Sequence, residues 1–272
     1  MSDGYFLIDS GGKRKLEQFG LYRLIRPAPQ ALWEPKLPEE WERCDAEFNR
    51  MGNIQWDKLP SFWHVTFDSL QLKLMPTDFG HLGLFPEHKM QWEYLEKRLS
   101  LKGGICLNLF AYSGAATLAF AKSNIPVCHV DASKKSVQWA KENAYLNQLS
   151  KASIRWIVDD VLQYLRREVK RGTVYQAILL DPPSFGRGNK RQVFKIERDL
   201  CTVLQLCMRI LDLKQGCLIL TCHTPGLTPM VLGELIRSIF PKGILQVGEM
   251  LISSHLSYSL PSGSYVRWLA QE

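Results

Sequence analysis

From residue 105 onward, short apolar runs alternate with segments of helical composition. The apolar runs are 105–110, 125–130, 154–158, 175–180 and 217–221. The helical segments are 115–123, 133–147, 160–170, 192–211 and 228–240. Short apolar runs separated by helices are typical of parallel strands joined by helical crossovers. The pattern therefore predicts an α/β fold built on a mostly parallel sheet.

The pattern changes at the end of the chain, where two strand-like runs follow each other without a helix. They are 244–252 and 265–269, and a connection rich in Ser, Pro and Gly joins them. We expect an antiparallel hairpin at one edge, which completes a doubly wound, Rossmann-like sheet of seven strands. A helix from about 86 to 99 should precede the first parallel strand, because Pro86 is a favourable first helical residue.

The beginning of the chain has a different pattern. Residues 5–9 and 21–26 are separated by a Ser-Gly-Gly turn and suggest a hairpin, and 62–75 alternates between apolar and polar residues. The stretch 27–60 is rich in Pro and Trp, which is untypical of a linker. We therefore expect a small β-rich subdomain over residues 1–75 and the main domain over 76–272.

Composition narrows the classes of function. The net charge of +7 indicates an anionic partner, and nucleic acid is the obvious candidate. No apolar run approaches the ~20 residues that cross a bilayer, and the first residues do not resemble a signal peptide. The seven cysteines include no CxxC pair, so reduced core thiols are the simplest interpretation. We expect a soluble cytoplasmic protein with no membrane partner and no metal site.

The loop after the first apolar run has the character of a ligand site. Ser113 and Gly114 follow the run, and Asp131 ends the next one. An acid roughly 20 residues past a glycine loop binds ribose hydroxyls in doubly wound folds. The loop lacks the full GxGxxG of dinucleotide binders, which disfavours a pyrophosphate and a Rossmann-type oxidoreductase. A ligand with a ribose and no phosphates fits better.

Acids also follow later strands. The carboxyl ends of parallel strands form the ligand edge of such a sheet, so Asp159, Asp160 and Asp181 should lie there. Asp159 or Asp160 could equally cap the following helix. In Asp181-Pro182-Pro183-Ser184-Phe185 the prolines remove two N–H donors, which leaves an acceptor-only cluster suited to the amine edge of a nucleobase. Phe185 could stack on that base.

Several motifs together resemble the class I S-adenosylmethionine-dependent methyltransferases, and specifically the branch that methylates bases of large-subunit ribosomal RNA. The resemblance covers roughly residues 80 to 225. It rests on LNLFAYSGAAT (107–117), VDASKKSVQWAKEN (130–143), DPPSF (181–185) and GLFPEHK (83–89). It implies S-adenosyl-L-methionine as cofactor and RNA, in particular ribosomal RNA, as substrate.

The resemblance also implies roles for individual residues. Asp131 would hold the ribose hydroxyls, Asp160 the adenine amine, and Ser113 and Gly114 the methionine end. The remaining members of the implied cofactor site are Asn108, Ala132, Val161, Asp181 and His88. The implied catalytic residues, which line the target-base pocket, are Asp181, Pro182, Pro183 and Phe185.

The acceptor atom is open at this stage. DPPSFGRGNKRQVFKIERD is most similar to the branch that methylates a guanine ring nitrogen, which favours a nitrogen acceptor. Methylation of cytosine carbon 5 would need a thiolate, and Cys222 is the candidate. Counted from Gly216, Cys222 falls one residue short of the family's nucleophile, and such an offset turns a strand side chain to the other face.

The basic residues offer two RNA-binding surfaces. Arg187, Lys190, Arg191 and Lys195 follow the proposed pocket and could contact phosphates, although a solvated helix face is equally compatible with them. The second surface is the N-terminal hairpin region, with Lys13, Arg14, Lys15, Arg23 and Arg26. A methyltransferase-fold RNA-binding module without catalysis remains an alternative function.

Overall fold

The computed structural model describes residues 4–48, 58–78, 80–187, 193–240 and 242–271. They form two compact units. The first contains Met1–Glu87 together with Leu251–Ser262, and the second contains His88–Met250 and Gly263–Glu272. A short segment from near the end of the chain thus belongs to the N-terminal unit, which the sequence pattern did not indicate. In the described ranges, no helix is both long and apolar enough to cross a membrane.

The first unit is built from β-strands. Its four-stranded sheet has the order β1-β2-β3-β4 and consists of β1 (Tyr5–Gly11), β2 (Arg14–Phe19), β3 (Tyr22–Pro27) and β4 (Ala46–Glu47). A separate hairpin contains β5 (Trp63–Phe67) and β6 (Leu70–Leu74), whose alternating burial matches the alternating sequence. The short helix α1 (Pro38–Trp41) completes this unit.

The segment 251–262 supplies part of the core of the first unit. Ile252 and Leu260 are buried in one apolar cluster with Leu7, Ala28 and Ala31. The hydroxyl of Ser257 also donates a hydrogen bond to Asp9. The sheet of the first unit is therefore covered by residues that lie some two hundred and fifty positions later in the chain.

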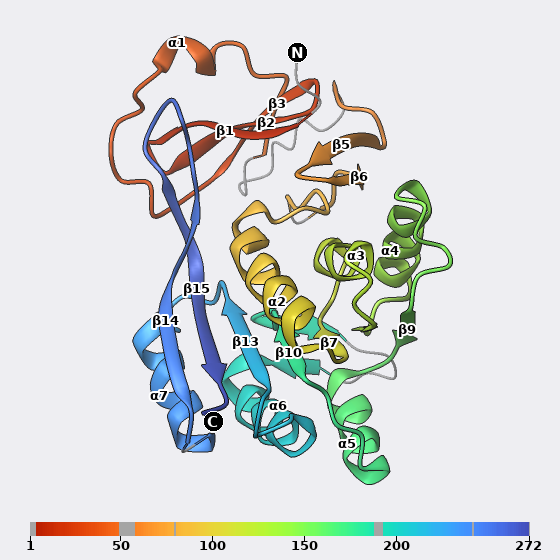
Figure 1. The fold of residues 1–272 in the computed structure, drawn as a ribbon. Coiled ribbons are helices and arrows are strands. Elements are labelled where there is room, and N and C mark those ends of the chain that lie inside the picture. Colours follow the sequence, from red (N-terminus) through yellow and green to blue (C-terminus); the bar gives the residue numbers. More distant parts are fainter. Residues whose placement is uncertain (1–3, 49–57, 79, 188–192, 241, 272) are drawn as a thin grey trace. The chain divides into compact units, whose positions relative to one another are not determined.

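The second unit contains the predicted seven-stranded sheet, in the order β14-β15-β13-β10-β7-β8-β9 (Figure 1). Strands β7 (Cys106–Leu109), β8 (Val127–Asp131), β9 (Ile154–Val158), β10 (Ala177–Leu180) and β13 (Cys217–Cys222) are parallel. Strand β15 (Leu260–Leu269) pairs antiparallel to β13, and β14 (Ile244–Ile252) forms the edge. The Rossmann-like fold class and its antiparallel edge are confirmed.

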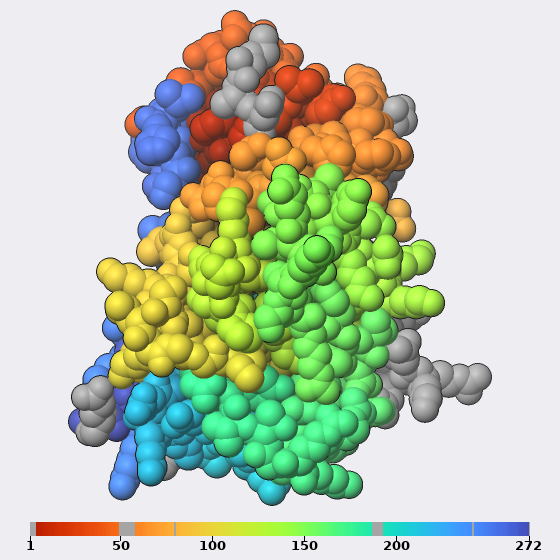
Figure 2. All heavy atoms as spheres, turned by 45° about the vertical axis from the view of Figure 1, so that its right-hand side comes forward, coloured from red at the N-terminus to blue at the C-terminus, as the bar shows by residue number. Residues whose placement is uncertain are grey.

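Helices cover both faces of this sheet. On one face α2 (Lys89–Lys102), α3 (Ala115–Lys122) and α4 (Lys134–Leu146) pack against one another. On the other, α5 (Val161–Arg171), α6 (Ile196–Ile210) and α7 (Pro229–Ile239) do the same. Figure 2 shows α2 in yellow and α4 in green at the surface of the second unit. Two of these helices begin after a side chain that caps them, Ser133 before α4 and Thr228 before α7.

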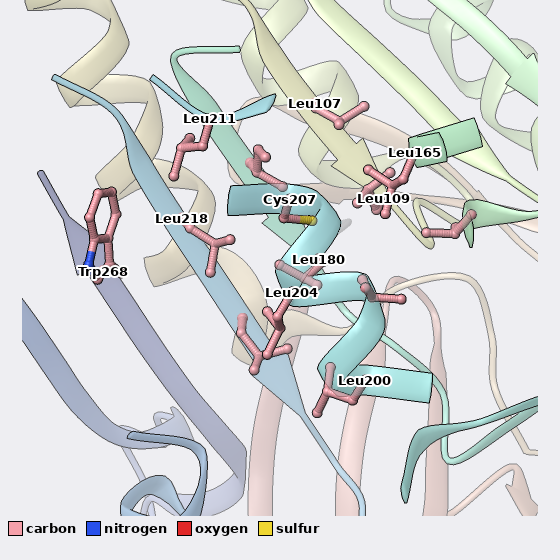
Figure 3. Close-up of a cluster of buried hydrophobic side chains, with 14 of the residues drawn as sticks. Leu107, Leu109, Leu165, Leu180, Leu200, Leu204, Cys207, Leu211, Leu218 and Trp268 are labelled. Carbon is pink, nitrogen blue, oxygen red and sulfur yellow. The ribbon is translucent and has the colours of Figure 1, made fainter. Parts of the chain in front are cut away.

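An extensive apolar core lies between the sheet and helices α5, α6 and α7 (Figure 3). Alternate residues of the parallel strands point into it, among them Leu109, Leu180 and Leu218. They contact one stripe of α6, which includes Leu204 and Cys207. Because each strand is thereby fixed in register, the loops at the strands' carboxyl ends are held at defined positions.

One predicted helix begins later than the sequence pattern indicated. The pattern predicted a helix from 192 to 211, but α6 starts at Ile196, after a two-stranded ladder of β11 (Phe185–Arg187) and β12 (Val193–Lys195). Phe194 is buried in the core, and the extended backbone that pairs β12 with β11 is what positions it there. The earlier start of the predicted helix was therefore wrong. Similarly, Pro86 opens a short 3-10 helix (Pro86–His88), and α2 itself begins at Lys89.

A buried ion cluster lies in the four-stranded sheet of the first unit. The carboxylate of Glu17 is fully buried and accepts two hydrogen bonds from Arg26, at 2.7 and 2.9 Å. Lys15 Nζ lies 3.2 Å from the same carboxylate, and the hydroxyl of Tyr5 donates to it at 2.9 Å. Burial alone would raise the pKa of Glu17, but the charges of Arg26 and Lys15 outweigh it and lower the pKa to about 2.

This cluster makes the stability of the first unit dependent on acid pH. A carboxyl whose pKa is lowered on folding, here from 4.5 to about 2, stabilises the fold above pH 4.5. That stabilisation is lost as the pH falls from 4.5 towards 2. We expect Glu17→Gln to remove this pH dependence, and to lower the free energy of unfolding at neutral pH by ~3 to 5 kcal/mol because Arg26 is left buried without its partner.

Urea unfolding followed by tryptophan fluorescence between pH 2 and pH 7 measures both effects. The exposed Glu39→Gln is the matched control and should leave the profile of the wild type unchanged. Parallel pH profiles for wild type and Glu17→Gln would contradict the assignment.

Candidate functional site

The loops that follow the parallel strands gather at one edge of the sheet. Adjacent parallel strands β8, β7, β10 and β13 end at neighbouring positions, as the pairs Leu109↔Val130, Leu180↔Leu109 and Leu180↔Leu220 show. The residues just past these ends are those that the sequence marked for chemistry. These residues form three groups, namely a glycine loop, a set of acidic residues, and the loop Asp181–Phe185.

The glycine loop has an unusual backbone. Phe110, Tyr112 and Gly114 all have positive φ angles, of 56°, 47° and 87°. A side chain at Gly114 would be strained by this φ, and its Cβ would come within 2.8 Å of Ala140 Cβ. The glycine is therefore required by the close approach of α4. Ser113 is buried in this loop.

Asp131 fixes this loop from the neighbouring strand. Its Oδ2 accepts a hydrogen bond from the backbone N–H of Tyr112 at 2.9 Å, and its Oδ1 accepts one from Ser133 at 2.8 Å. Burial raises the pKa of Asp131, while the two backbone N–H groups act in the opposite direction. The ring of Tyr112 packs edge-on against Trp139, with centroids 5.4 Å apart. The carboxylate thus lies at the carboxyl end of β8 beside the glycine loop, and its role as a ribose acceptor stays a prediction.

Asn108, another predicted cofactor residue, lies in a buried polar network. Its side-chain nitrogen donates to Thr117 Oγ1 at 2.9 Å, and that oxygen lies 2.9 Å from Nδ1 of His129. Burial lowers the pKa of His129 to about 3, so the ring is neutral at physiological pH. The structure therefore gives Asn108 a role in joining β7 to α3, and a cofactor contact stays a prediction.

The acids after β9 both have structural partners. Asp160 is the N-cap of α5, because its Oδ1 accepts from the N–H of Gln163 at 3.0 Å. Asp159 forms an ion pair with Arg167. The helix-capping interpretation is therefore correct for Asp160, and a contact of its Oδ2 with the cofactor stays a prediction. Val161, the first residue of α5, is buried.

The remaining predicted cofactor residues are Ala132, next to Asp131 in the sequence, and His88, which lies near Asp181. Ala132 lies between Asp131 and the N-cap residue Ser133, and it is partly buried. His88 is distant in sequence but lies at the N-terminus of α2, where its Nε2 is 3.8 Å from Asp181 Oδ2. The structure thus brings the predicted His88 to the predicted catalytic loop.

Within the Asp181–Phe185 loop, a hydrogen bond from the next strand orients the carboxylate. The hydroxyl of the buried Thr221 donates to Asp181 Oδ1 at 2.7 Å. Pro182 is buried and Pro183 is exposed, so only the second ring faces outward. Phe185 starts β11 and is 53% exposed, which leaves an aromatic face available to a planar ligand.

Two further contacts at this loop were not expected from the sequence. Nε2 of His88 lies 2.9 Å from Nε2 of His223, and the hydroxyls of Ser184 and Thr224 are 2.7 Å apart. Within 221–224, the sequence pattern assigned a possible role to Cys222 alone. The two-residue period of strand β13 is the signal that separates Thr221 and His223 from Cys222.

Cys222 points into the core. Its side chain is 1% exposed and belongs to the apolar cluster beneath the sheet. Burial raises the pKa of this thiol, and a hydrogen bond of 3.4 Å from the N–H of Thr224 only partly opposes that effect. A reactive cysteine needs thiolate character and access, and Cys222 has neither.

The basic residues that follow the Asp181–Phe185 loop differ in their exposure and in their partners. Arg187 and Lys195 lie on the β11–β12 ladder and not on a helix, and Lys195 is exposed. Lys190 and Arg191 lie outside the described residues. Arg198, at the start of α6, is engaged with Asp199 at 2.8 Å.

The N-terminal basic residues are mostly paired within their own unit. Arg26 and Lys15 belong to the buried ion cluster around Glu17. Arg23 pairs with Glu40 at 2.6 Å, and Arg14 lies 3.4 Å from Glu47. These four basic side chains therefore have acidic partners within the unit, and a role of this region in binding phosphates stays a prediction.

Comparison with known proteins relates the chain to methyltransferases. Residues 89–202 match the family described as Conserved hypothetical protein 95. A solved S-adenosylmethionine-dependent methyltransferase from Agrobacterium tumefaciens superposes with a TM-score of 0.91 and is 36% identical. That match covers 98% of this chain and 90% of the Agrobacterium chain.

Curated relatives match over a part of their length. The proteins named ribosomal RNA large subunit methyltransferase K/L of Syntrophotalea carbinolica and Pseudoalteromonas atlantica are 36% and 31% identical over 137 and 199 residues. These matches cover 50% and 70% of this chain, but 18% and 27% of the two relatives. The chain therefore spans a minor part of these longer proteins.

The burial of Cys222 leads to a direct chemical expectation. Alkylation of the native protein with iodoacetamide at pH 8 should modify the exposed Cys201 and leave Cys222 unmodified, because the thiolate is the reactive form and Cys222 is buried with a raised pKa. Mass spectrometry of the digested protein measures both sites in one sample. Equal rates at the two cysteines would mean that Cys222 is accessible, and denatured protein provides the control for complete labelling.

Proposed function

Because the chain belongs to the class I S-adenosylmethionine-dependent methyltransferases, we propose that it methylates a nucleobase of RNA. The acceptor in this proposal is a ring or exocyclic nitrogen of ribosomal RNA. The observation that carries the proposal is the loop Asp181–Phe185, which follows β10 and presents a carboxylate held by Thr221 and an exposed aromatic ring. In the sheet, β7 alone separates β10 from β8, the strand that ends at Asp131. The names of the curated relatives support ribosomal RNA as the substrate.

S-adenosylmethionine is the cofactor, and it supplies a methyl group on a sulfonium centre. The residues at the sheet edge fit such a molecule. Each oxygen of Asp131 accepts one backbone N–H, which leaves further lone pairs for the two ribose hydroxyls. In the proposed site Asp160 Oδ2 accepts the adenine amine beside Ala132 and Val161, and Ser113 and Gly114 border the methionine end.

The proposed acceptor pocket is formed by Asp181, Pro182, Pro183 and Phe185. The prolines have no N–H to donate, so the loop offers acceptors to the amine edge of a base. Phe185 supplies a face for stacking. A nitrogen with its own lone pair needs no covalent activation, and holding it in line with the methyl group while water is excluded accounts for catalysis.

The state of Cys222 supports a nitrogen acceptor over cytosine carbon 5. Methylation of that carbon requires a thiolate that adds to the ring. Cys222 is 1% exposed, faces the apolar core and has a raised pKa. Its neighbours on the strand, Thr221 and His223, are the residues that meet Asp181 and His88.

Basic residues next to the acceptor loop are the proposed RNA contacts. Arg187 and Lys195 lie on the two paired strands β11 and β12, where Lys195 is the partner of Phe185, and Lys190 and Arg191 belong to the same stretch of sequence. Lys and Arg at such a place contribute affinity and orientation through phosphates, without reading the base sequence. The net charge of +7 is consistent with this role.

Replacement of Asp131 tests the cofactor side. Asp131→Ala should weaken S-adenosylmethionine binding by roughly 10- to 150-fold, since a charge-assisted hydrogen bond contributes ~1.5 to 3 kcal/mol. Isothermal calorimetry measures the dissociation constant. Asp131→Asn, which keeps one acceptor oxygen and loses the charge, should fall between wild type and alanine. An unchanged constant for Asp131→Ala would rule out the ribose assignment.

Replacement of Asp181 tests the methyl transfer itself. Asp181→Ala should abolish turnover while cofactor affinity stays within about twofold of wild type, because the residue is assigned to the acceptor. Mass spectrometry of ribosomal RNA nucleosides, from cells without the gene and from cells complemented with each variant, measures the product. The exposed Asp78→Ala is the control and should restore methylation fully.

The same experiment separates the alternatives. A methylated cytosine carbon that disappears with Cys222→Ser would favour the carbon-5 reaction. RNA that binds tightly and carries no gene-dependent methyl group would favour a non-catalytic RNA-binding module.

A further inference from the structure

Three side chains direct potential metal ligands towards one point beside the Asp181–Phe185 loop. Nε2 of His88 and Nε2 of His223 are 2.9 Å apart, and Nε2 of His88 lies 3.8 Å from Asp181 Oδ2. One ligand atom from each of these residues lies within 4.8 Å of the others. The three residues come from different segments of the second unit, so no single sequence motif contains all of them.

The register of the sheet explains how two of the three meet. Strands β10 and β13 pair with Leu180 opposite Leu220, so the next residues, Asp181 and Thr221, are also neighbours. Side chains alternate along a strand, so His223 leaves on the same side as Thr221. Cys222, between them, turns into the core. Proximity of His223 to Asp181 is thus a consequence of strand pairing.

Hydrogen bonds hold the two loops in this arrangement. Thr221 donates to Oδ1 of Asp181 at 2.7 Å, and this bond turns the other oxygen, Oδ2, towards His88. The hydroxyls of Ser184 and Thr224, 2.7 Å apart, tie the loop after β10 to the loop after β13. Metal sites in proteins commonly have such outer hydrogen bonds, which orient the ligating carboxylate.

We propose that His88, Asp181 and His223 bind one divalent transition-metal ion of the Zn²⁺ class. Two imidazole nitrogens and one carboxylate oxygen are a typical ligand set for such ions, whereas Ca²⁺ and Mg²⁺ prefer oxygen alone. Bonds of ~2.0 to 2.2 Å in a tetrahedral site place neighbouring ligand atoms roughly 3.3 Å apart. The observed separations of 2.9 and 3.8 Å lie on either side of that value.

The third distance, between the ligand atoms of His223 and Asp181, can be shortened by a small movement of the His223 side chain. His223 is exposed, so its ring can turn towards Asp181 without disturbing the core. Three protein ligands leave a fourth position open, as in catalytic zinc sites. Two neutral imidazoles and one carboxylate leave a net charge of about +1 on the bound ion. The open position therefore suits an anionic oxygen or a lone-pair nitrogen, both of which RNA provides.

Zinc titration tests this site directly. In a Cys201→Ser background, which removes the exposed thiol as a competing ligand, calorimetry should show one Zn²⁺ per chain. His223→Gln should weaken binding at least ~10-fold, because even outer-sphere replacements cost that much. The matched control is His255→Gln, an exposed histidine outside the cluster, which should bind like the parent.

Cobalt provides a second and independent measurement. Co²⁺ in the parent protein should show the intense visible absorption of a tetrahedral site with nitrogen and oxygen ligands, and His88→Gln or His223→Gln should remove it. Circular dichroism shows that each variant is folded. No stoichiometric Zn²⁺ binding, or equal binding by the parent and His223→Gln, would overturn the proposal and leave a hydrogen-bonded histidine pair. Nucleoside mass spectrometry reports on methyl transfer separately, so either proposal can fail alone.

Discussion

The carboxylate of Asp131 joins two loops that belong to different strands. It accepts one backbone N–H from Tyr112 after β7 and another from Ser133 after β8. A buried carboxylate needs such donors, because water no longer solvates it. The loop that it anchors contains two residues with positive φ angles, Phe110 and Tyr112, a conformation that the surrounding structure has to support. The cofactor side of the molecule thus depends on a single charged group.

The proposed acceptor pocket is held in a similar way, at the ends of strands β10 and β13. There the carboxylate of Asp181 is held by Thr221, and the two belong to neighbouring strands in parallel register. Helix α6 packs the apolar face of the same strands, so register and burial are fixed together. Ligand-facing residues and core residues therefore alternate along β13, and a shift by one residue would exchange Thr221 for Cys222 at the site.

The regular part of the fold was predictable because local pattern and burial agree there. Residues 106–109 within the apolar run 105–110 are all buried, and the loop that the sequence marked as a ligand site follows that run. The start of α6 was predicted too early because residues 193–195 are ordered by pairing with Phe185–Arg187, a contact that periodicity does not report. His223 escaped assignment for a related reason, since its partners lie on segments remote in sequence. Net charge also does not report pairing, and at the N-terminus Arg26 and Arg23 form ion pairs with Glu17 and Glu40.

The composition of the first unit has a consequence for how the chain acquires its structure. Ile252 and Leu260 complete the apolar cluster around Leu7, so residues at opposite ends of the sequence share one core. During synthesis the N-terminal strands leave the ribosome long before their partners exist, and closing so long a loop is slow. The second unit can form most of its parallel sheet in the meantime. The first unit therefore reaches its final form only after residues 251–262 have been synthesised, and residues 1–87 made alone would expose the surface that 251–262 normally covers.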